Sequence, residues 1–277
     1  MNPRVVALTA LAMAAFAANS LLCRLALAGT TIDAASFTTI RIACGAAMLA
    51  VILRSQGKRP MAGGSWPAAA MLFAYAAGFS LAYRELTAAT GALLLFGAVQ
   101  MTMLGYGFLQ GERLRLLPSI GLLAALAGLG VLLIPGFETP SLLAGGCMVG
   151  AGLAWGIYSL LGKGASNPTE ATAGNFLRAV PFAAVLALAT TGTATIDRTG
   201  ALYAAISGAI TSGLGYVLWY AVLPRLKATS AATIQLSVPV LATLGGATLL
   251  AEPVTGRLLM ASVAIIGGIA LVITSKR

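Results

Sequence analysis

The second half of this chain repeats the first half at a fixed spacing, and no other feature of the sequence restricts its fold as strongly. Thr90 and Thr229 each stand at the start of a long apolar run, 229 − 90 = 139 positions apart. Glu112 and Glu252 lie where these two runs end, 252 − 112 = 140 positions apart. The chain has 277 residues, so the spacing is about half its length. The sequence therefore predicts two structural repeats, with residues 1–138 in the first and residues 139–277 in the second.

The composition excludes several classes of protein. Hydrophobic residues make up 59% of the chain, charged residues make up 9%, and the mean hydropathy is +0.93, whereas a soluble domain carries about 25% charged residues. The sequence contains no histidine, which excludes imidazole metal sites, Ser-His-Asp triads and histidine proton relays. Its three cysteines form no CxxC pair. We therefore expect that the protein is not an enzyme and uses neither a metal ion nor a cofactor.

Ten apolar stretches have the length that a helix needs to cross the hydrocarbon core of a bilayer, which is about 20 residues. They do not alternate between apolar and polar positions, as membrane-spanning strands do. The sequence therefore predicts an all-α integral membrane protein with ten transmembrane helices. The ten stretches are 3–27, 33–54, 66–84, 88–110, 115–135, 141–164, 170–192, 199–224, 228–250 and 256–275.

The basic residues indicate the orientation of these helices. The net charge of +10 does not indicate a nucleic-acid partner, because the basic residues stand singly or in short groups without interleaved aromatic residues. Lys and Arg favour cytoplasmic loops, and a cytoplasmic N-terminus places eleven of them inside and three outside. We therefore expect both termini in the cytoplasm, as an even number of helices requires. The inner set is Arg4, Arg54, Lys58, Arg59, Arg113, Arg115, Lys163, Arg225, Lys227, Lys276 and Arg277, and the outer set is Arg84, Arg198 and Arg257.

Five helices in each half give the two halves opposite orientations, because an odd number of crossings reverses the direction of the chain. Inverted repeats are the architecture of many secondary transporters, in which the two halves exchange conformations and open a central cavity to each side in turn. The sequence thus indicates alternating access. The repeat also argues against the remote alternative of a non-transporting membrane receptor or scaffold.

Four residues in two helices are candidates for the wall of such a cavity. Phe16 and Asn19 lie three positions apart on one face of the first stretch, and the positions 139 later are Trp155 and Tyr158. A polar group at mid-bilayer must find a partner, so these residues are informative. We expect them to line opposing walls and to bind substrate. The alternative is that Asn19 joins neighbouring helices by a hydrogen bond.

Two glutamines and a proline lie in the middle of the fourth and ninth stretches. Gln100 is followed 139 positions later by Pro239, and Gln235 lies one turn before that proline. A proline inside a helix frees a backbone carbonyl and bends the helix, so we expect Pro239 to act as a hinge. We expect Gln100 and Gln235 to contact substrate. Gln235 has an alternative role, because its amide could instead bond the carbonyl that Pro239 frees.

Aromatic residues near helix ends are further candidates. Phe79 and Tyr83 lie at the outer end of the third stretch, and we expect them to contact substrate. Trp219 and Tyr220 lie near the inner end of the eighth stretch, where Trp219 is a candidate gate. The alternative for both pairs is an aromatic belt at the membrane interface.

Charges inside the stretches are few. Arg41 and Arg178 either bind a carboxylate or phosphate of the substrate, or reach the near interface or a backbone carbonyl. The sequence places no acidic residue clearly at mid-stretch, because Glu112 and Glu252 lie at helix ends and Glu85 and Glu170 lie near loops. A carboxylate proton carrier at the membrane centre is therefore not expected.

The whole pattern resembles the drug/metabolite transporter superfamily with two EamA domains. The resemblance rests on the ten helices in two repeats and on the turns Glu-Arg-Leu at Glu112 and Glu-Pro-Val at Glu252. The second half follows the family pattern, including Pro239, whereas Gln100 stands where the family commonly has proline. Residues 96–103, Phe-Gly-Ala-Val-Gln-Met-Thr-Met, are similar to the YddG subgroup of aromatic amino acid exporters.

This resemblance implies export of aromatic and other neutral amino acids, or related small amphipathic metabolites, across the bacterial inner membrane. An aromatic cavity with a few amides suits such substrates, because rings stack while amides orient the charged groups. The alternative is export of multiple drugs or cationic compounds, held by cation–π contacts with Trp155 and Tyr158. The expected partners are a small-molecule substrate and the lipid bilayer, and we expect the protein to work as a monomer.

Overall fold

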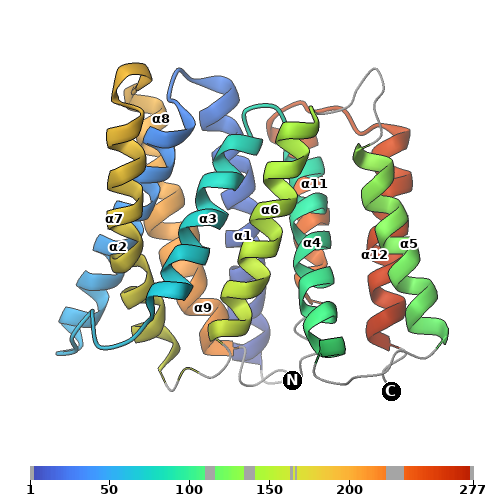
Figure 1. Ribbon diagram of the computed structural model, residues 1–277, viewed down its shortest axis with the longest axis horizontal. Coiled ribbons are helices and arrows are strands. Elements are labelled where there is room, and N and C mark those ends of the chain that lie inside the picture. The colour runs from blue at the N-terminus through green and yellow to red at the C-terminus, as the bar shows by residue number, and fades with distance from the viewer. Residues whose placement is uncertain are drawn as a thin grey trace.

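The computed structural model describes residues 3–109, 116–133, 141–162, 165, 167–222 and 234–274, and within these ranges the chain is helical with no strand. The helices stand side by side as upright rods (Figure 1). Their bounds are α1 Pro3–Gly29, α2 Ala34–Ser55, α3 Trp66–Ala82, α4 Ala88–Leu109, α5 Leu116–Leu133, α6 Leu142–Gly162, α7 Pro168–Ala189, η1 Thr191–Thr193, α8 Arg198–Ile206, η2 Ser207–Leu214, α9 Gly215–Val222, α11 Ser237–Leu249 and α12 Gly256–Thr274.

The all-helical membrane fold predicted from the sequence is confirmed. Each of the ten predicted stretches corresponds to one rod, with α8, η2 and α9 continuous in the eighth. Six rods are long and apolar enough to cross a bilayer, and the other four contain shorter apolar helices. The expected boundary between residues 138 and 139 and the start of the ninth stretch, residues 228–233, lie outside the described residues.

The ninth stretch differs from its prediction at Pro239. The sequence predicts Pro239 in the middle of a helix, but a turn at Leu236 precedes it and α11 begins only at Ser237. Pro239 therefore lies in the first turn of α11, where a missing N–H is tolerated. The break falls just where a proline would clash with the carbonyl four residues before it. Whether Pro239 is a hinge stays a prediction.

Polar side chains in the loops define where several helices begin. Asp33 accepts hydrogen bonds from the backbone N–H groups of the first turn of α2, at 2.9 Å. Ser65, Asn167 and Asp197 do the same for α3, α7 and α8. These four caps satisfy N–H groups that a helix leaves without internal partners. They also place the polar connections at the two ends of the rods.

The helices pack in a pattern that places the centre of the molecule among α1, α3, α4, α6 and α9. In Figure 1, α2, α7 and α8 lie on one side and the pair α5–α12 on the other. Helix α3 packs on α6, and α1 packs on α8, η2 and α9; α4 packs on α6, and α11 packs on α1. Helix α1 begins and α12 ends at the same end of the bundle, called the lower end below. Helix α1 ends and α2 begins at the upper end.

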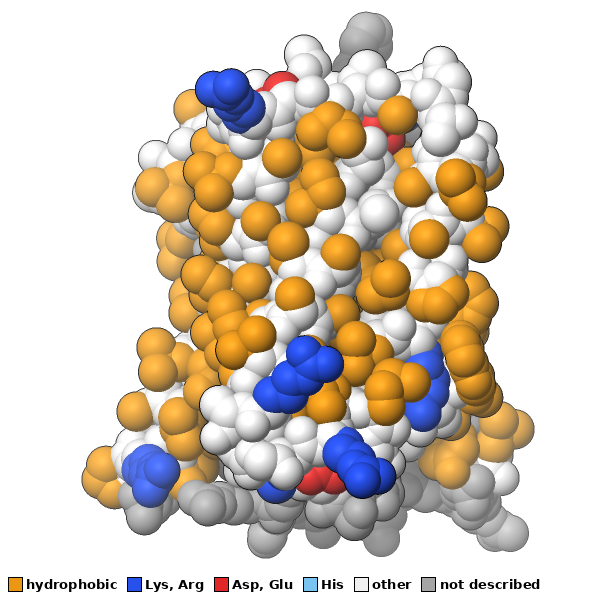
Figure 2. Space-filling model, turned by 90° about the vertical axis from the view of Figure 1, so that its left-hand side faces the viewer, with side chains coloured by type: hydrophobic (Ala, Val, Ile, Leu, Met, Phe, Trp, Pro, Cys, Tyr) orange, Lys and Arg blue, Asp and Glu red, His pale blue; other side chains and the backbone are white. Residues whose placement is uncertain are grey.

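The outer face of the bundle is suited to lipid. Figure 2 shows apolar side chains over the middle of one face, with acidic side chains only near its ends and most of the basic ones toward its lower end. Large apolar residues on the bundle surface are exposed, among them Val51, Leu188 and Leu202. Exposed Arg54, Lys58 and Arg59 follow one another where α2 ends, at the lower end. An apolar belt between charged ends is the pattern that a bilayer requires of the surface it covers.

A π-helical segment interrupts the eighth rod. In residues Ser207–Leu214 the backbone hydrogen bonds span five residues instead of four, and such segments occur frequently at functional sites. Gly208, inside this segment, lies against the backbone of α2: a Cβ atom there would be 2.1 Å from the carbonyl oxygen of Arg41. Only glycine permits this approach, which brings the hydroxyl side chains of η2 to the centre of the bundle.

Candidate functional site

A small cavity lies at the centre of the bundle. Its volume is about 20 Å³, roughly the room that one ordered water molecule needs. Helices α1, α3, α4, α6 and α9 supply the wall, and most of its side chains are aromatic. The lining residues are Phe16, Asn19, Ser20, Tyr75, Phe79, Leu95, Phe96, Trp155 and Tyr216. The structure is therefore of a closed state, because a metabolite is many times larger than this space.

The structure brings most of the predicted substrate contacts to this cavity or to the rings beside it. Phe16, Asn19, Phe79 and Trp155 form part of its wall. Tyr83 lies directly behind Phe79, with ring centroids 4.6 Å apart, and Tyr158 lies 5.4 Å from Trp155. Their roles in binding substrate stay predictions.

Trp155 is the centre of the aromatic packing. Its ring centroid lies 4.9 Å from Tyr75 of α3 and 4.8 Å from Tyr216 of α9. Phe16 of α1 meets Trp155 edge to face at 6.2 Å, and the predicted gate residue Trp219 at 6.0 Å. Rings from four helices thus fill the middle of the bundle, and each pair adds stabilisation beyond the area that it buries.

Asn19 connects three helices through its buried amide. Its Oδ1 accepts a hydrogen bond from Ser207 Oγ at 2.7 Å, and Thr211 Oγ1 lies 3.0 Å from the same oxygen. Its Nδ2 donates to the Tyr75 hydroxyl at 3.3 Å. The position of Asn19 agrees with both roles considered from the sequence, because the residue lines the cavity and its amide also joins helices. Its amide is satisfied in the closed state.

Arg41 extends this network and is almost wholly buried, with 2% of its surface exposed. Its Nη2 donates to the Tyr75 hydroxyl at 3.0 Å and its Nε to Ser212 Oγ at 3.3 Å. The guanidinium carbon lies 5.1 Å from the ring centroid of Tyr75 and 5.0 Å from that of Phe79. Arg41 thus does not reach the interface, and it pairs with no backbone carbonyl of the described residues; these were the two structural roles considered from the sequence.

Arg178 takes the structural role instead. Its Nη1 donates to the backbone carbonyls of Gly63 at 2.6 Å and Gly174 at 3.1 Å, at the lower end of the bundle. The two arginines looked alike in the sequence, but they have different surroundings.

Reasoning from sequence did not single out Tyr75, Tyr216, Ser207 or Thr211. The two tyrosines carried a signal, because Tyr75 stands four residues before Phe79 and Tyr216 four residues before Tyr220, on shared helix faces. The hydroxyl residues carried none, since Ser and Thr are common in transmembrane helices.

The predicted residues Gln100, Gln235 and Pro239 do not line the cavity. All three are buried, Gln100 in α4, Gln235 just before α11 and Pro239 in its first turn. The closed state thus gives Gln100 and Gln235 no place on the wall, and their contact with substrate stays a prediction about another state.

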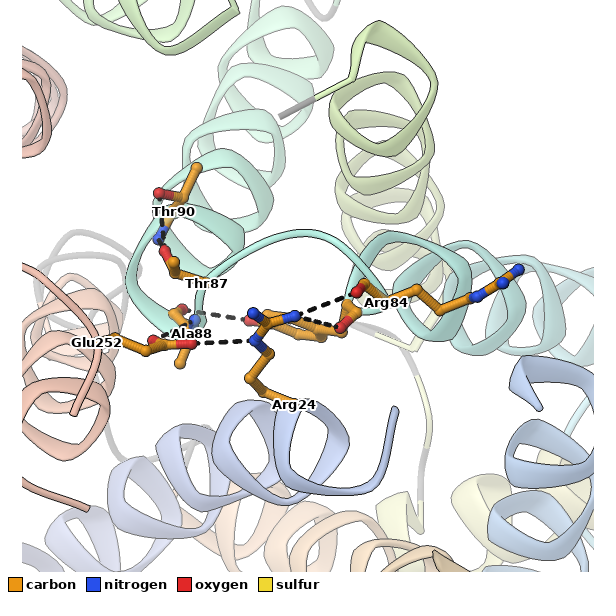
Figure 3. Close-up of polar contacts among 7 residues, drawn as sticks. Arg24, Arg84, Thr87, Ala88, Thr90 and Glu252 are labelled. Atoms are coloured by element: carbon orange, nitrogen blue, oxygen red, sulfur yellow. Dashed lines mark hydrogen bonds and ion pairs between the residues drawn. The ribbon is translucent and has the colours of Figure 1, made fainter. Parts of the chain in front are cut away.

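An ion pair closes the upper end of the bundle above the cavity. Arg24 Nε lies 3.0 Å from Glu252 Oε1, and Arg24 Nη1 donates to the carbonyls of Tyr83 and Arg84, both at 3.2 Å. The other carboxylate oxygen, Oε2, accepts from the backbone N–H of Ala88 at 2.8 Å, at the first residue of α4. Figure 3 shows these contacts joining α1, the connection between α3 and α4, and the segment after α11.

The backbone next to Glu252 is shaped for this contact. Ala251 has a φ of 51°, the left-handed conformation that residues other than glycine rarely adopt. The N–H of Glu252 then bonds back to the carbonyl of Gly246 at 3.0 Å. A Cβ atom on Gly246 would lie 2.7 Å from Glu252 Oε2, so the missing side chain leaves room for the carboxylate.

Comparisons with known proteins agree with this architecture. Residues 143–274 match the EamA-like transporter family. Over 275 residues the chain is 54% identical to uncharacterized protein PA1977 of Pseudomonas aeruginosa, covering 99% of this chain and 96% of that protein. It also has the fold of a chain described as "Crystal structure of protein", with a TM-score of 0.68 and 19% identity over 100% of this chain and 99% of the other.

Proposed function

Because residues 143–274 match the EamA-like transporter family, we propose that the chain is a secondary transporter of the bacterial inner membrane that exports small amphipathic metabolites. The proposed substrates are aromatic and other neutral amino acids, and the proposed mechanism is alternating access. The family supports a membrane transporter that carries small molecules. The substrate class and the direction of transport are inferences from the cavity and from the sequence resemblance.

The observation that carries the proposal is the wall of the central cavity. Six of its nine lining residues are aromatic, and the amide of Asn19 stands among them. Aromatic faces hold an apolar or aromatic side chain, and an amide orients an ammonium or a carboxylate group. In the closed state these rings fill the space themselves. We infer that they separate when substrate enters.

The packing supports two halves that exchange conformations. The contact of α3 with α6 has a counterpart in the contact of α1 with α8, η2 and α9, as an inverted five-helix repeat requires. Helix α3 carries Tyr75, Phe79 and Tyr83 from the cavity toward the upper end. Helix α9 carries Tyr216, Trp219 and Tyr220 toward the lower end. We propose that these are the upper and the lower aromatic gate.

The orientation follows from the charges at the lower end. Arg54, Lys58 and Arg59 are exposed there, at the end where α1 begins and α12 ends. By the positive-inside rule, these charges support a cytoplasmic location for the lower end and for both termini. The upper end with its Arg24–Glu252 pair faces outward. The cavity lies inside one chain, which supports a transporter that works as a monomer.

The second candidate, export of cationic drugs, would also use the aromatic wall, through cation–π attraction. The acidic residues that the structure describes are Asp33, Glu85, Glu170, Asp197 and Glu252, and all lie at helix ends or in connections. A cation in the cavity would have none of these carboxylates beside it. Neutral amino acids therefore fit the site better.

Counterflow in proteoliposomes tests this function. Vesicles loaded with unlabelled amino acid should accumulate the same labelled amino acid, with phenylalanine, tyrosine and tryptophan exchanged faster than glutamate or lysine. Trp155→Ala should lose this exchange, and vesicles without protein give the background. Exchange of ethidium but of no amino acid would replace the proposal by the drug-export alternative. Exchange of neither would refute both.

A further inference from the structure

Arg41 carries a positive charge that nothing among the described residues neutralises. Its two side-chain acceptors, the hydroxyls of Tyr75 and Ser212, are both neutral. Glu252 and Glu170 are engaged by Arg24 and Lys58 at the two ends of the bundle. A buried charge in a membrane protein is costly unless it is paired, and such residues commonly mark the path of a substrate or an ion.

Two donors at this place have no acceptor. The Nη1 of Arg41 and the hydroxyl of Tyr216 are buried without a hydrogen-bond partner among the residues that the structure describes. Buried polar groups are nearly always hydrogen-bonded, and an exception requires an explanation. Both groups can give a hydrogen to an oxygen acceptor. The centre of the bundle therefore has more donors than acceptors.

Arg41 stands one side chain behind the cavity wall. Its guanidinium lies against the rings of Tyr75 and Phe79, and both rings line the cavity. Tyr216 lines the same cavity. The Tyr75 hydroxyl accepts from both Arg41 and Asn19, so it connects the buried charge to the wall. A shift of the two rings would expose the charge to an occupant of the cavity.

From these observations we propose that Arg41, assisted by the Tyr216 hydroxyl, binds the carboxylate of the substrate, and that the transported compounds are organic monocarboxylates with an apolar or aromatic tail. The inference rests on the proposed function, and it makes the carboxylate the required group. One buried charge matches one negative charge, and a guanidinium binds a carboxylate with two parallel hydrogen bonds. The amino group of an amino acid is then tolerated rather than required.

The test compares ligands that differ in one group. Binding of L-phenylalanine, 3-phenylpropionate, 2-phenylethylamine and 4-methylpentanoate to the purified full chain is measured by isothermal titration calorimetry. The first two should bind at least about tenfold more tightly than the amine, because a hydrogen bond to a charged group is worth at least that factor. The aliphatic carboxylate should bind in the same Arg41-dependent way.

Variants locate the effect. Arg41→Gln should reduce the preference for phenylpropionate over phenylethylamine to about threefold or less, and Arg41→Lys should keep part of it, because the charge remains. Tyr216→Phe removes one hydroxyl with little change in packing and should weaken both carboxylates severalfold while leaving the amine unaffected. Arg178→Gln is the control: it should lower the melting temperature without changing the preference.

Each outcome decides the inference. Equal binding of acid and amine by the natural chain overturns it, as does binding of no carboxylate at all. An unchanged preference in Arg41→Gln also overturns it; if that variant does not fold, unchanged preferences in both Arg41→Lys and Tyr216→Phe do the same. Arg41-dependent binding without counterflow would refute transport and leave this site standing. Arg41-dependent binding of 4-methylpentanoate alone would refute only the aromatic substrate class.

Discussion

Arg24 and Glu252 are 228 positions apart in the chain, and their side chains meet at 3.0 Å above the central cavity. The carboxylate also receives the N–H of Ala88, while the guanidinium binds the carbonyls at the end of α3 (Figure 3). Four segments that would have to separate for the cavity to open upward are thus joined by one pair of side chains. In the proposed transport cycle, this pair stabilises closure of the outer end.

Removing that pair should open the upper end more often. In a variant without native cysteines, Glu252→Gln should raise the labelling rate of a cysteine introduced at Ser20, which lines the cavity, by about five- to tenfold. The loss of one charge-assisted contact, about 1–1.5 kcal/mol, gives this factor. A membrane-impermeant maleimide added outside cells measures the rate.

The matched control for this prediction lies at the other end of the bundle. Lys58 pairs with Glu170 at 3.2 Å, and both side chains are more exposed than those of Arg24 and Glu252. Lys58→Gln should leave labelling from outside unchanged, because an exposed pair contributes little. An equal rise in both variants would show that general loosening, and not the upper ion pair, governs access.

The sequence predicted the rods well because a bilayer requires long apolar stretches, whatever faces they present. It could not predict which face meets the cavity, since residues facing lipid and residues facing the bundle are both apolar. Phe16 and Trp155 were found because the 139-residue spacing selected them, and they contact each other at 6.2 Å. The site of Arg41 depends on η2, and no local pattern in the sequence marks a π-helical segment.

Trp155 should determine preference for aromatic substrates. Trp155→Leu keeps an apolar side chain but loses stacking, so exchange of phenylalanine should fall by about two- to tenfold relative to exchange of leucine. Trp155→Phe should keep most of the preference for phenylalanine over leucine. Initial rates of counterflow with the two amino acids measure this preference in each variant.

Trp66 is the control residue for this substitution. It is exposed near the lower end of α3, and among the described aromatic rings it touches only Phe182, at 6.0 Å. Trp66→Leu should leave the ratio of the two rates unchanged. A parallel loss of phenylalanine and leucine exchange in Trp155→Leu would indicate a general packing defect instead of a substrate contact.

Acid should weaken the connection between two loops at the upper end of the bundle. Asp33 accepts from the N–H of Thr195 at 2.7 Å, and Asp197 accepts from the N–H of Thr31 at 3.1 Å. Partial burial would raise the pKa of Asp33, but hydrogen bonds from Ser36, Thr195 and Ala35 lower it below its usual value overall. The pKa of Asp197 is lowered chiefly by the N–H of Gly200.

A lowered folded-state pKa sets the sign of the effect. Each carboxylate contributes stability that is complete above its pKa in the unfolded chain, which is about 4. This stability is lost as the pH falls through its pKa in the folded chain. The melting temperature of the natural chain in detergent should therefore exceed that of the Asp33→Asn variant by a constant amount above about pH 5. The difference should shrink below pH 4. A difference that grows in acid would contradict the hydrogen-bonding account.

Gly208 should be the glycine least tolerant of substitution beside the candidate site. A Cβ atom there would lie 2.1 Å from the carbonyl oxygen of Arg41, and a backbone atom cannot move aside as a flexible side chain can. Gly208→Ala must push η2 away from α2, which costs about 1–3 kcal/mol, and it should lengthen the contact between Arg41 and Ser212. The melting temperature should fall, and carboxylate binding should weaken with it.

Gly150→Ala is the matched control, because a Cβ atom at this position of α6 meets no atom of the described residues within 4 Å. Alanine also favours the helix over glycine by up to about 1 kcal/mol, so this variant should be as stable as the natural chain or more so. Equal melting temperatures for the two variants would show that α2 and η2 are free to separate, and that the close approach does not hold Arg41 in place.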